Sequence, residues 1–357
     1  MADAVQSLAD RVRAAADAGM RLCLRGGGTK DFYGGALEGE PLDTRAHAGV
    51  VRYDPTELVI TARCGTPLAQ LEATLDENGQ MLAFEPPHFA RDGRAATLGG
   101  CVAAGLSGPR RAAAGALRDF VLGAVLLDGR ARVLRFGGEV MKNVAGYDVA
   151  RLLAGSLGTL GVLLEVSLKV LPRPVEELSL RLELTQDAAI AQLNAWGGQP
   201  LPISASAWCD GLLHLRLSGA TAAVRAARSV IGGEALAGDV ATAFWRSVRE
   251  QTHAFFASEA PLWRLAVPST TPLLALSAAP FIEWGGALRW VPTRPGDPIP
   301  REAAARAGGH ATLFRAQDKS AGAFAPLDAV SMRLHRGLKA ALDPSGIFNR
   351  GRIYPDL

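Results

Sequence analysis

The chain has 357 residues, and its 38 Lys and Arg nearly balance its 35 Asp and Glu, which leaves a formal net charge of +3. The basic residues are scattered rather than gathered into blocks, which argues against a nucleic-acid partner. At roughly 150 residues per domain, this length predicts two domains that each bury their own core.

The first part of the chain has the pattern of alternating helices and strands. Apolar residues recur at helical spacing until Gly19, and strict alternation follows directly. Further on, Thr66 followed by Pro67 is typical of an N-cap and a first-turn proline, ahead of three leucines on one helical face. We therefore expect a helix, a strand, a second strand and a second helix over 5–16, 21–25, 59–62 and 68–75.

The next part of the chain has an antiparallel pattern. Two apolar runs, 121–127 and 131–136, flank Asp128 and Gly129, a dipeptide that strongly favours a β-hairpin. A further run over 162–170 alternates strictly between apolar and other residues. Antiparallel strands that follow α/β elements indicate an α+β fold rather than a doubly wound sheet.

Beyond the prolines at 172 and 174, a second α+β unit of about 150 residues is predicted, which is a typical domain size. Its expected strands cover 178–184, 212–217 and 287–291, and the expected helices cover 188–195, 222–231 and 326–342.

The four cysteines are widely spaced and include no C-x-x-C pair, which favours small buried thiols in a reducing compartment over a disulfide framework. They are Cys23, Cys64, Cys101 and Cys209. Residues 1–10 have neither the basic nor the apolar region of a secretory signal. The longest uncharged run, 265–282, contains three prolines that would break a membrane helix. We therefore expect a cytoplasmic protein, at most peripheral to a membrane.

Three glycine-rich segments are the candidate ligand-binding residues. The segments are Arg25-Gly26-Gly27-Gly28-Thr29-Lys30, then Thr97-Leu98-Gly99-Gly100 continuing through Gly105, Ser107 and Gly108 to Arg110 and Arg111, and finally Gly155-Ser156-Leu157-Gly158-Thr159-Leu160-Gly161-Val162. Glycines allow backbone N–H groups to converge on an anion, and nearby arginines can balance phosphate charge. Each segment taken alone is also compatible with a plain turn or a bulged strand start.

Two competing phosphate motifs do not fit the first segment. Asp31 follows Lys30 where a nucleoside-triphosphate loop needs Ser or Thr. The G-x-G-x-x-G spacing that starts at Gly26 also ends on Asp31 rather than on a glycine. Neither an NTPase loop nor a Rossmann fingerprint is therefore expected.

The three segments in this order, separated by strands, resemble the FAD-binding domain of the vanillyl-alcohol-oxidase and p-cresol-methylhydroxylase flavoproteins. The resemblance implies that the first segment holds the pyrophosphate, the second lies by phosphate and ring, and the third wraps the adenine side. It implies a two-subdomain FAD-binding domain over 1–174, a second, smaller α+β cap domain over 175–325, and a C-terminal helix and tail over 326–357 that return to the FAD domain.

Other stretches are similar to the FAD-binding subunits of bacterial glycolate oxidases. They are P-P-H-F at 86–89, A-A-G-L-S-G-P-R-R at 103–111 and F-G-G-E-V-M-K-N-V-A-G-Y-D at 136–148. Near the C-terminus, D-P-S-G-I-F-N-R-G at 343–351 resembles the D-P-x-G-x-[FL]-N-P-G element of the superfamily, with Arg350 in place of proline. The resemblance implies that Asn349 faces the flavin.

The resemblance implies FAD as the cofactor. Several relatives bond the flavin covalently to a His or Cys, but this region of the first segment has Thr29 and Lys30 and no histidine, so we expect noncovalent binding. Cys101 is better explained as a packed small thiol than as a linkage site. The expected cofactor-binding residues are Arg25, Gly26, Gly27, Gly28, Thr29, Lys30, Pro86, Pro87, Thr97, Leu98, Gly99, Gly100, Gly105, Ser107, Gly108, Gly155, Ser156, Gly158, Thr159, Gly161, Val162 and Asn349.

No catalytic base is predicted. The 2-hydroxy-acid dehydrogenases of this superfamily hold a divalent metal with closely spaced histidines, but no two of the six histidines here have ligand-pair spacing, so no metal is expected. Lys142 and Tyr147 are candidates for lining the flavin edge, against the alternative of a solvated charge and a packed aromatic ring.

The resemblance implies an FAD-dependent oxidoreductase subunit of a glycolate (2-hydroxy acid) oxidase. It would assist the oxidation of glycolate to glyoxylate beside a larger catalytic FAD subunit and an iron–sulfur subunit that takes the electrons, with membrane contact only peripherally, at the inner membrane, through the complex. The spaced cysteines agree, because a cluster needs grouped thiolates. One alternative is an independent 2-hydroxy-acid dehydrogenase with a carboxylate clamp from Arg264, Arg289 or Arg315. The other is a scaffold with an empty, degenerate flavin site.

Overall fold

A five-stranded antiparallel sheet organises the first half of the molecule. The computed structural model describes residues 2–138 and 147–357. The strands lie in the spatial order β3 (Val50–Asp54), β4 (Val59–Arg63), β8 (Val162–Lys169), β6 (Val121–Leu127) and β7 (Val133–Gly137). The central strands β6 and β8 are buried along most of their length, as expected of strands covered on both sides.

A register shift in the pairing of β8 with β6, between Leu163 and Glu165, places side chains two residues apart on β8 in different hydrophobic cores. Val166 and Leu168 pack on one face with α2 (Leu68–Asp76) and α3 (Leu98–Ala104). Val162 and Leu164 pack on the opposite face. The elements of that second core are α1 (Ala2–Ala18) and the parallel strand pair β1 (Leu22–Arg25) and β2 (Glu40–Asp43). Because β1 and α3 pack on opposite faces of the same sheet, the sheet sets the positions of the end of β1 and the start of α3.

An eight-stranded antiparallel sheet organises the second half. Its strands are, in spatial order, β13 (Glu234–Ala235), β10 (Glu176–Glu183), β12 (Leu212–Gly219), β11 (Ile203–Cys209), β15 (Phe281–Glu283), β16 (Leu288–Pro292), β14 (Leu262–Ala266) and β17 (His310–Arg315). Helices α7 (Gln186–Gly197), α8 (Thr221–Ile231) and α10 (Arg301–Arg306) pack on one face. The opposite face packs with α9 (Gly238–Arg249).

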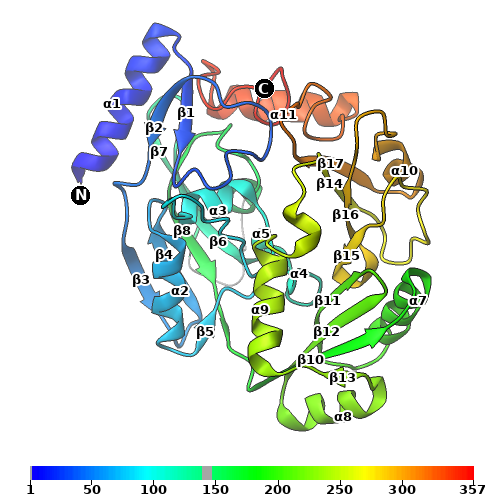
Figure 1. Cartoon of the computed structure of the whole chain (residues 1–357). Coiled ribbons are helices and arrows are strands. Elements are labelled where there is room, and N and C mark those ends of the chain that lie inside the picture. Colours follow the sequence, from blue (N-terminus) through cyan, green and yellow to red (C-terminus); the bar gives the residue numbers. More distant parts are fainter. Residues whose placement is uncertain (1, 139–146) are drawn as a thin grey trace.

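The inner face of the eight-stranded sheet shares a hydrophobic cluster with the first half. Tyr33 and Leu106 from the first half join Trp245, Trp290 and Phe314 in this cluster. Figure 1 shows the two sheets side by side, with α9 along the boundary between them. The two halves are thus joined by a common core, and loops of the first half lie against side chains of the second.

The C-terminal segment returns to the first half. Helix α11 (Ala329–Leu342) leads to Asp343, which is buried and accepts hydrogen bonds from the N–H groups of Ile347 (3.1 Å) and Phe348 (2.9 Å). Phe348 forms a parallel bridge with Leu22, so the tail extends the β1–β2 pair. This return places residues near 350 beside the loop that follows β1.

Most of the expected elements are confirmed, and the α+β class is confirmed. The elements that were not predicted include β2, β3 and α3 in the first half, and β11, β13, β14, β15, β17, α9 and α10 in the second. The short remaining elements are α4 (Arg111–Ala114), α5 (Leu117–Phe120), α6 (Val149–Leu152), β5 (Gln80–Met81), β9 (Leu171–Pro172) and the 3-10 turns η1 (Ala254–Ala257) and η2 (Trp284–Gly286). Lys142 and most of the stretch 136–148 lie outside the described residues.

Two local predictions were wrong. Thr66 does not cap α2, because Pro67 holds the cap position and the Thr66 hydroxyl accepts the N–H of Gly49 at 2.8 Å. The hairpin after β6 is present, but Ala131 lies in its loop with a φ of +55°. The carboxylate of Asp128 accepts the N–H groups of Arg130 and Arg132, at 3.0 and 2.8 Å, and this contact lengthens the connection.

Candidate functional site

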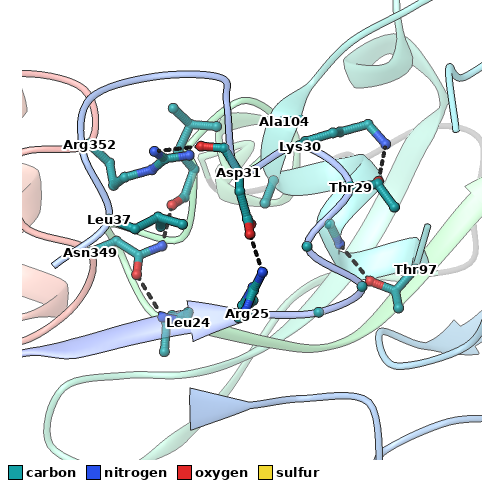
Figure 2. A pocket seen from close by; sticks show the side chains of 16 residues that line it. Leu24, Arg25, Thr29, Lys30, Asp31, Leu37, Thr97, Ala104, Asn349 and Arg352 are labelled. Atoms are coloured by element: carbon teal, nitrogen blue, oxygen red, sulfur yellow. Dashed lines mark hydrogen bonds and ion pairs between the residues drawn. The ribbon is translucent and has the colours of Figure 1, made fainter. Parts of the chain in front are cut away.

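A groove opens in the first half where the three glycine-rich segments meet. One cavity of about 520 Å³ lies against the loop after β1, and an adjoining cavity of about 400 Å³ reaches the 157–163 loop. Both cavities are lined by Leu24, Arg25, Gly26, Gly100, Ala103, Leu157 and Asn349. The glycine-lined groove, as we call this pair of cavities, therefore gathers residues from four distant parts of the sequence. Figure 2 shows the first of the two cavities.

The first wall of the groove requires glycine. A Cβ on Gly27 would lie 1.6 Å from the carbonyl oxygen of Ala95, and a Cβ on Gly26 would lie 2.3 Å from Oγ1 of Thr97. Gly28 has a φ of +69°, in the left-handed region that glycine adopts without strain. The loop therefore presents backbone rather than side chains to the groove.

The second wall is the first turn of α3. Thr97 is the N-cap of this helix, and its hydroxyl accepts the N–H of Gly100 at 3.2 Å. A Cβ on Gly99 would lie 2.8 Å from the Cβ of Cys64, so this turn packs closely on the end of β4. Glycines at 99 and 100 keep the groove side of the turn free of bulk.

The third wall is fixed by Asn349. Its Oδ1 accepts the N–H of Leu24 at 2.7 Å, and its Nδ2 donates to the carbonyl of Leu157 at 2.6 Å. A Cβ on Gly158 would lie 2.7 Å from that Nδ2 atom. Asn349 thus lines the groove while both ends of its amide bind backbone, so it positions two walls. Arg350 is exposed, and these contacts form without the usual proline.

The groove carries positive groups that are only partly neutralised. The guanidinium of Arg25 pairs with Asp31, and Arg94 lies 3.8 Å from the same carboxylate. Nε of Arg25 is buried and has no hydrogen-bond partner among the described residues. Lys30 is partly buried, and this burial lowers its pKa; its ammonium donates to the carbonyl of His88 at 3.3 Å.

Two cations that the sequence did not single out hold the loop over 31–35. Arg352 donates to the carbonyls of Asp31, Tyr33 and Gly35. Lys319 donates to the carbonyls of Phe32 and Gly34. Burial, together with the charge of Arg352, lowers the pKa of Lys319 to about 8. No local pattern marks these residues, because each lies about 300 positions from the loop it holds.

Several expected cofactor-binding residues lie outside the glycine-lined groove. Leu98 is in the core, Gly105 caps the end of α3, and Thr159 donates to the carbonyl of Ser156 at 2.8 Å within the turn that starts at Gly155. Pro86 is buried. Pro87, Ser107 and Gly108 line another cavity, which we call the cap cavity, between the first half and the eight-stranded sheet.

Three further candidate residues, Arg110, Arg111 and Tyr147, lie away from the glycine-lined groove. Arg110 does not lie at the glycine-lined groove, because it is buried in ion pairs with Glu85 and Glu177. Arg111 instead stacks its guanidinium on Trp284, 4.4 Å from the ring centre. Tyr147 is 95% exposed and lines neither cavity.

The described cysteines and acidic residues do not suggest a metal site. Among residues 2–138 and 147–357, no group of three or more His, Cys, Asp or Glu side chains is placed to hold a metal ion. All four thiols are free, and burial raises the pKa of Cys101 to about 12. No helix in the described ranges is both long and apolar enough to cross a membrane.

The comparisons with known proteins agree with this architecture. A family model described as an FAD binding domain matches residues 1–137. Among solved structures, alkyldihydroxyacetonephosphate synthase superposes with a TM-score of 0.65 over 96% of this chain and 75% of that one, at 14% identity, a likeness of fold. The matched domain and the likeness of fold define a protein with an FAD-binding fold of the vanillyl-alcohol-oxidase type.

The sequence relatives identify the family to which the chain belongs. The chain is 50% identical over 355 residues to "Glycolate oxidase subunit GlcE" of Escherichia coli (strain K12), covering 99% of each chain. A D-lactate dehydrogenase of Archaeoglobus fulgidus is 35% identical over 172 residues, 46% of this chain and 37% of that one. The chain belongs to the family of the glycolate oxidase subunit GlcE.

Proposed function

We propose that this chain is the FAD-binding subunit of a multi-subunit glycolate (2-hydroxy acid) oxidase and binds FAD in the glycine-lined groove. The single observation that carries the proposal is the groove itself, whose walls leave no room for a Cβ at Gly26 or Gly27. Its buried Arg25 Nε lacks a partner among the described residues, which suits an anionic ligand.

Three groups of residues would hold the cofactor. Gly26, Gly27, Gly28 and Thr29 would present N–H and hydroxyl donors to the pyrophosphate, with Arg25 as counter-charge. Gly158, Gly161 and Val162 would line the adenosine end. Bound FAD would act as the acceptor of hydride and electrons. The residues of this chain would orient the cofactor and exclude water.

We propose noncovalent attachment. Thr29 and Lys30 end the first glycine segment, and neither forms the flavin linkage that a His or Cys provides. Cys101 is fully buried in the core and its raised pKa keeps the thiol protonated, so it is unreactive. Denaturing the purified protein in acid should release all of its yellow colour into the supernatant, whereas colour that stays with the precipitated chain would contradict this.

In the proposed complex, glycolate is oxidised to glyoxylate and the electrons pass to an iron–sulfur subunit beside a larger FAD subunit. The name of the relative from Escherichia coli, a glycolate oxidase subunit, supports the assembly with other subunits. The free cysteines here are spread over the chain, and an iron–sulfur cluster would need grouped thiolates from another protein.

An anaerobic absorption spectrum of the purified chain tests the proposal. The chain alone should show the flavin spectrum and keep it oxidised on addition of glycolate, then bleach once the partner subunits are supplied. A colourless folded chain that takes up no added FAD would overturn the proposal. Bleaching by glycolate without partners would replace it with a stand-alone dehydrogenase.

A further inference from the structure

A further cavity lies beside α9, at the boundary between the two halves. We call it the boundary cavity. Its volume of about 570 Å³ lies within the range of small-molecule sites, and it shares no residue with the glycine-lined groove. Its walls come from residues of the first half and from β10, β12 and α9 of the second. Figure 1 shows α9 along this boundary, so a ligand in the cavity would contact both halves.

The two acids that line the boundary cavity are already neutralised. Glu85 pairs with Arg216 at 2.8 Å and with Arg110 at 3.4 Å. Glu177 pairs with the same two arginines. Because two carboxylates face two guanidinium groups, this network contributes no net charge to the cavity, and its acids would repel an anion only weakly.

Three further arginines line the boundary cavity, whereas no further acid of the described residues does. Arg246 of α9 is exposed and pairs with no acid among residues 2–138 and 147–357. The closest ion pairs of the other two are Arg173 with Asp76, at 2.7 Å, and Arg249 with Glu250, at 2.8 Å. Neither of these carboxylates lines the cavity. The side of the arginines that faces the cavity therefore makes its wall cationic.

Ser179 adds a buried hydrogen-bond donor to the wall. The residue is only 4% exposed, and its hydroxyl oxygen accepts the indole N–H of Trp245 at 2.8 Å. The hydroxyl itself donates to no acceptor in the described part of the chain. Both residues line the boundary cavity. A buried donor without an acceptor is unfavourable, so a ligand oxygen that accepts this O–H would be stabilised.

The remaining wall of the boundary cavity is mainly apolar. Leu178, Leu236 and Ala241 line it together with the indole ring of Trp245. An apolar wall with a few polar groups is the usual composition of a small-molecule site. Here the polar groups with unused capacity are donors, which excludes a cation as the ligand and favours a molecule that carries several anionic oxygens.

We propose that the boundary cavity binds a small polyanion, whose phosphate or carboxylate oxygens contact Arg173, Arg246 and the hydroxyl of Ser179. A guanidinium group suits both kinds of anion, because its planar N–H donors match two oxygens at once. Arg173 follows β9 of the first half and Arg246 lies on α9 of the second, so the ligand would bridge the halves and stabilise their docking. This site is separate from the proposed FAD site and does not depend on it.

The experiment is titration of the purified full chain by calorimetry and by thermal melting, in excess FAD so that the glycine-lined groove is filled. Inorganic pyrophosphate and citrate are the two probes, and they distinguish a phosphate ligand from a carboxylate ligand. Potassium chloride at equal ionic strength controls for screening. We expect saturable binding of at least one probe, together with a rise in melting temperature, and we expect this binding to weaken as salt is added.

Variants at exposed arginines assign the binding to the boundary cavity. Arg246→Met should weaken binding of the better probe by about threefold to tenfold, and adding Arg173→Met should weaken it further. Arg246→Lys should keep most of the binding, because the positive charge remains. Arg225→Met, at an exposed position of α8 outside the cavity, is the matched control and should bind as the unmodified chain does. Arg246→Met should melt at the same temperature as the unmodified chain when no probe is present, since Arg246 has no ion pair with a described residue to lose.

The possible outcomes separate this proposal from the proposed function. Stronger binding of pyrophosphate would identify a phosphate ligand, and stronger binding of citrate a carboxylate ligand. Absence of saturable binding by both probes, or equal binding by Arg246→Met and the unmodified chain, overturns the proposal. A chain that takes up no FAD but binds a probe in a manner that depends on Arg246 contradicts the proposed function alone.

Discussion

The glycine-lined groove and the cap cavity differ in what their walls are made of. The glycine-lined groove has backbone in part of its walls, at Gly26, Gly27, Gly28 and Gly100, and the absence of Cβ atoms allows these glycines to pack at close range. The cap cavity is walled by long side chains, such as Arg264, Glu283 and Trp290, from neighbouring strands of the eight-stranded sheet. A binding site made of backbone can therefore be predicted from a short stretch of sequence, whereas a site made of side chains depends on how distant strands pack together.

The largest expected effect concerns the contact that keeps the two halves together. Arg216 is 7% exposed and its guanidinium lies 2.8 Å from Glu85 of the first half. Arg216→Met leaves the Glu85 carboxylate buried with one partner fewer, which should lower the free energy of unfolding by about 3–5 kcal/mol. Chemical denaturation measures this change.

Arg181→Met is the matched control for that variant. Arg181 pairs with Glu234 on the neighbouring strand of the same sheet, but both side chains are largely exposed. Removing this pair should cost less than about 1 kcal/mol. Equal effects of the two substitutions would mean that the network around Glu85 does not join the halves.

The next effect is the pH dependence that Glu283 gives to stability. Its pKa in the folded chain is about 7, above its ordinary value of 4.5, because the carboxyl is buried. Between these two pH values the folded chain therefore holds a proton that the unfolded chain has lost. The contribution of Glu283 to the free energy of unfolding is complete below pH 4.5 and is lost as the pH rises to about 7. The loss amounts to about 3 kcal/mol.

Glu283→Gln should remove this slope. Melting curves between pH 5 and 8 should show the variant gaining stability relative to the unmodified chain as pH rises. Glu302→Gln, at an exposed position of α10, serves as the control and should leave the slope unchanged. If the pH dependence of the melting temperature is unchanged in Glu283→Gln, it comes from another group, and Glu283 is not protonated in the folded chain as described.

A third prediction breaks the backbone wall of the glycine-lined groove. In Gly27→Ala the new Cβ meets the carbonyl oxygen of Ala95, so the loop must move away from the first turn of α3. We expect FAD affinity to fall by roughly 30- to 100-fold, equivalent to about 2–3 kcal/mol. Flavin content after purification and FAD titration of the stripped protein measure the loss.

Gly197→Ala is the control for that variant, because a Cβ there meets no atom within 4 Å. It should retain the full flavin content. Full flavin content in Gly27→Ala would contradict the close approach of backbone to the cofactor.

The smallest expected effect sharpens the electrostatics of the glycine-lined groove. Asp31 pairs with Arg25 at its edge, and both side chains are partly exposed. Asp31→Asn removes a negative charge from the groove and frees Arg25, so FAD should bind tighter by up to about 1 kcal/mol, or roughly fivefold. Asp10→Asn, whose partner Arg13 lies on α1 outside the groove, should have no effect on FAD affinity in the same fluorescence titration. Unchanged or weaker binding in Asp31→Asn would show that Asp31 does not compete with the ligand for Arg25.

Much of the fold could be predicted from the sequence. The strict alternation of 162–170 is confirmed as β8, and the helical spacing at the N-terminus is confirmed as α1. β11 was not predicted, since its small alternating residues, I-S-A-S-A-W-C, carry little apolar contrast. The division of the chain at 174 and 325 stays a prediction, because the hydrophobic cluster around Trp290 crosses between the halves.

The sequence by itself determined the glycine segments, because a missing Cβ and a positive φ are local properties of a residue and its neighbours. It did not identify Arg352 or Lys319, nor the hydrogen bonds that join Asn349 to Leu24 and Leu157, while the role of Asn349 toward the flavin stays a prediction. Only the tertiary structure decided which arginines are buried in ion pairs, as Arg110 is, and which lie over an aromatic ring, as Arg264 does. The physical reason is that the role of a long charged side chain depends on the partner that the fold brings within hydrogen-bond distance. That partner is set by the order of the strands and the packing of the two halves rather than by spacing along the chain.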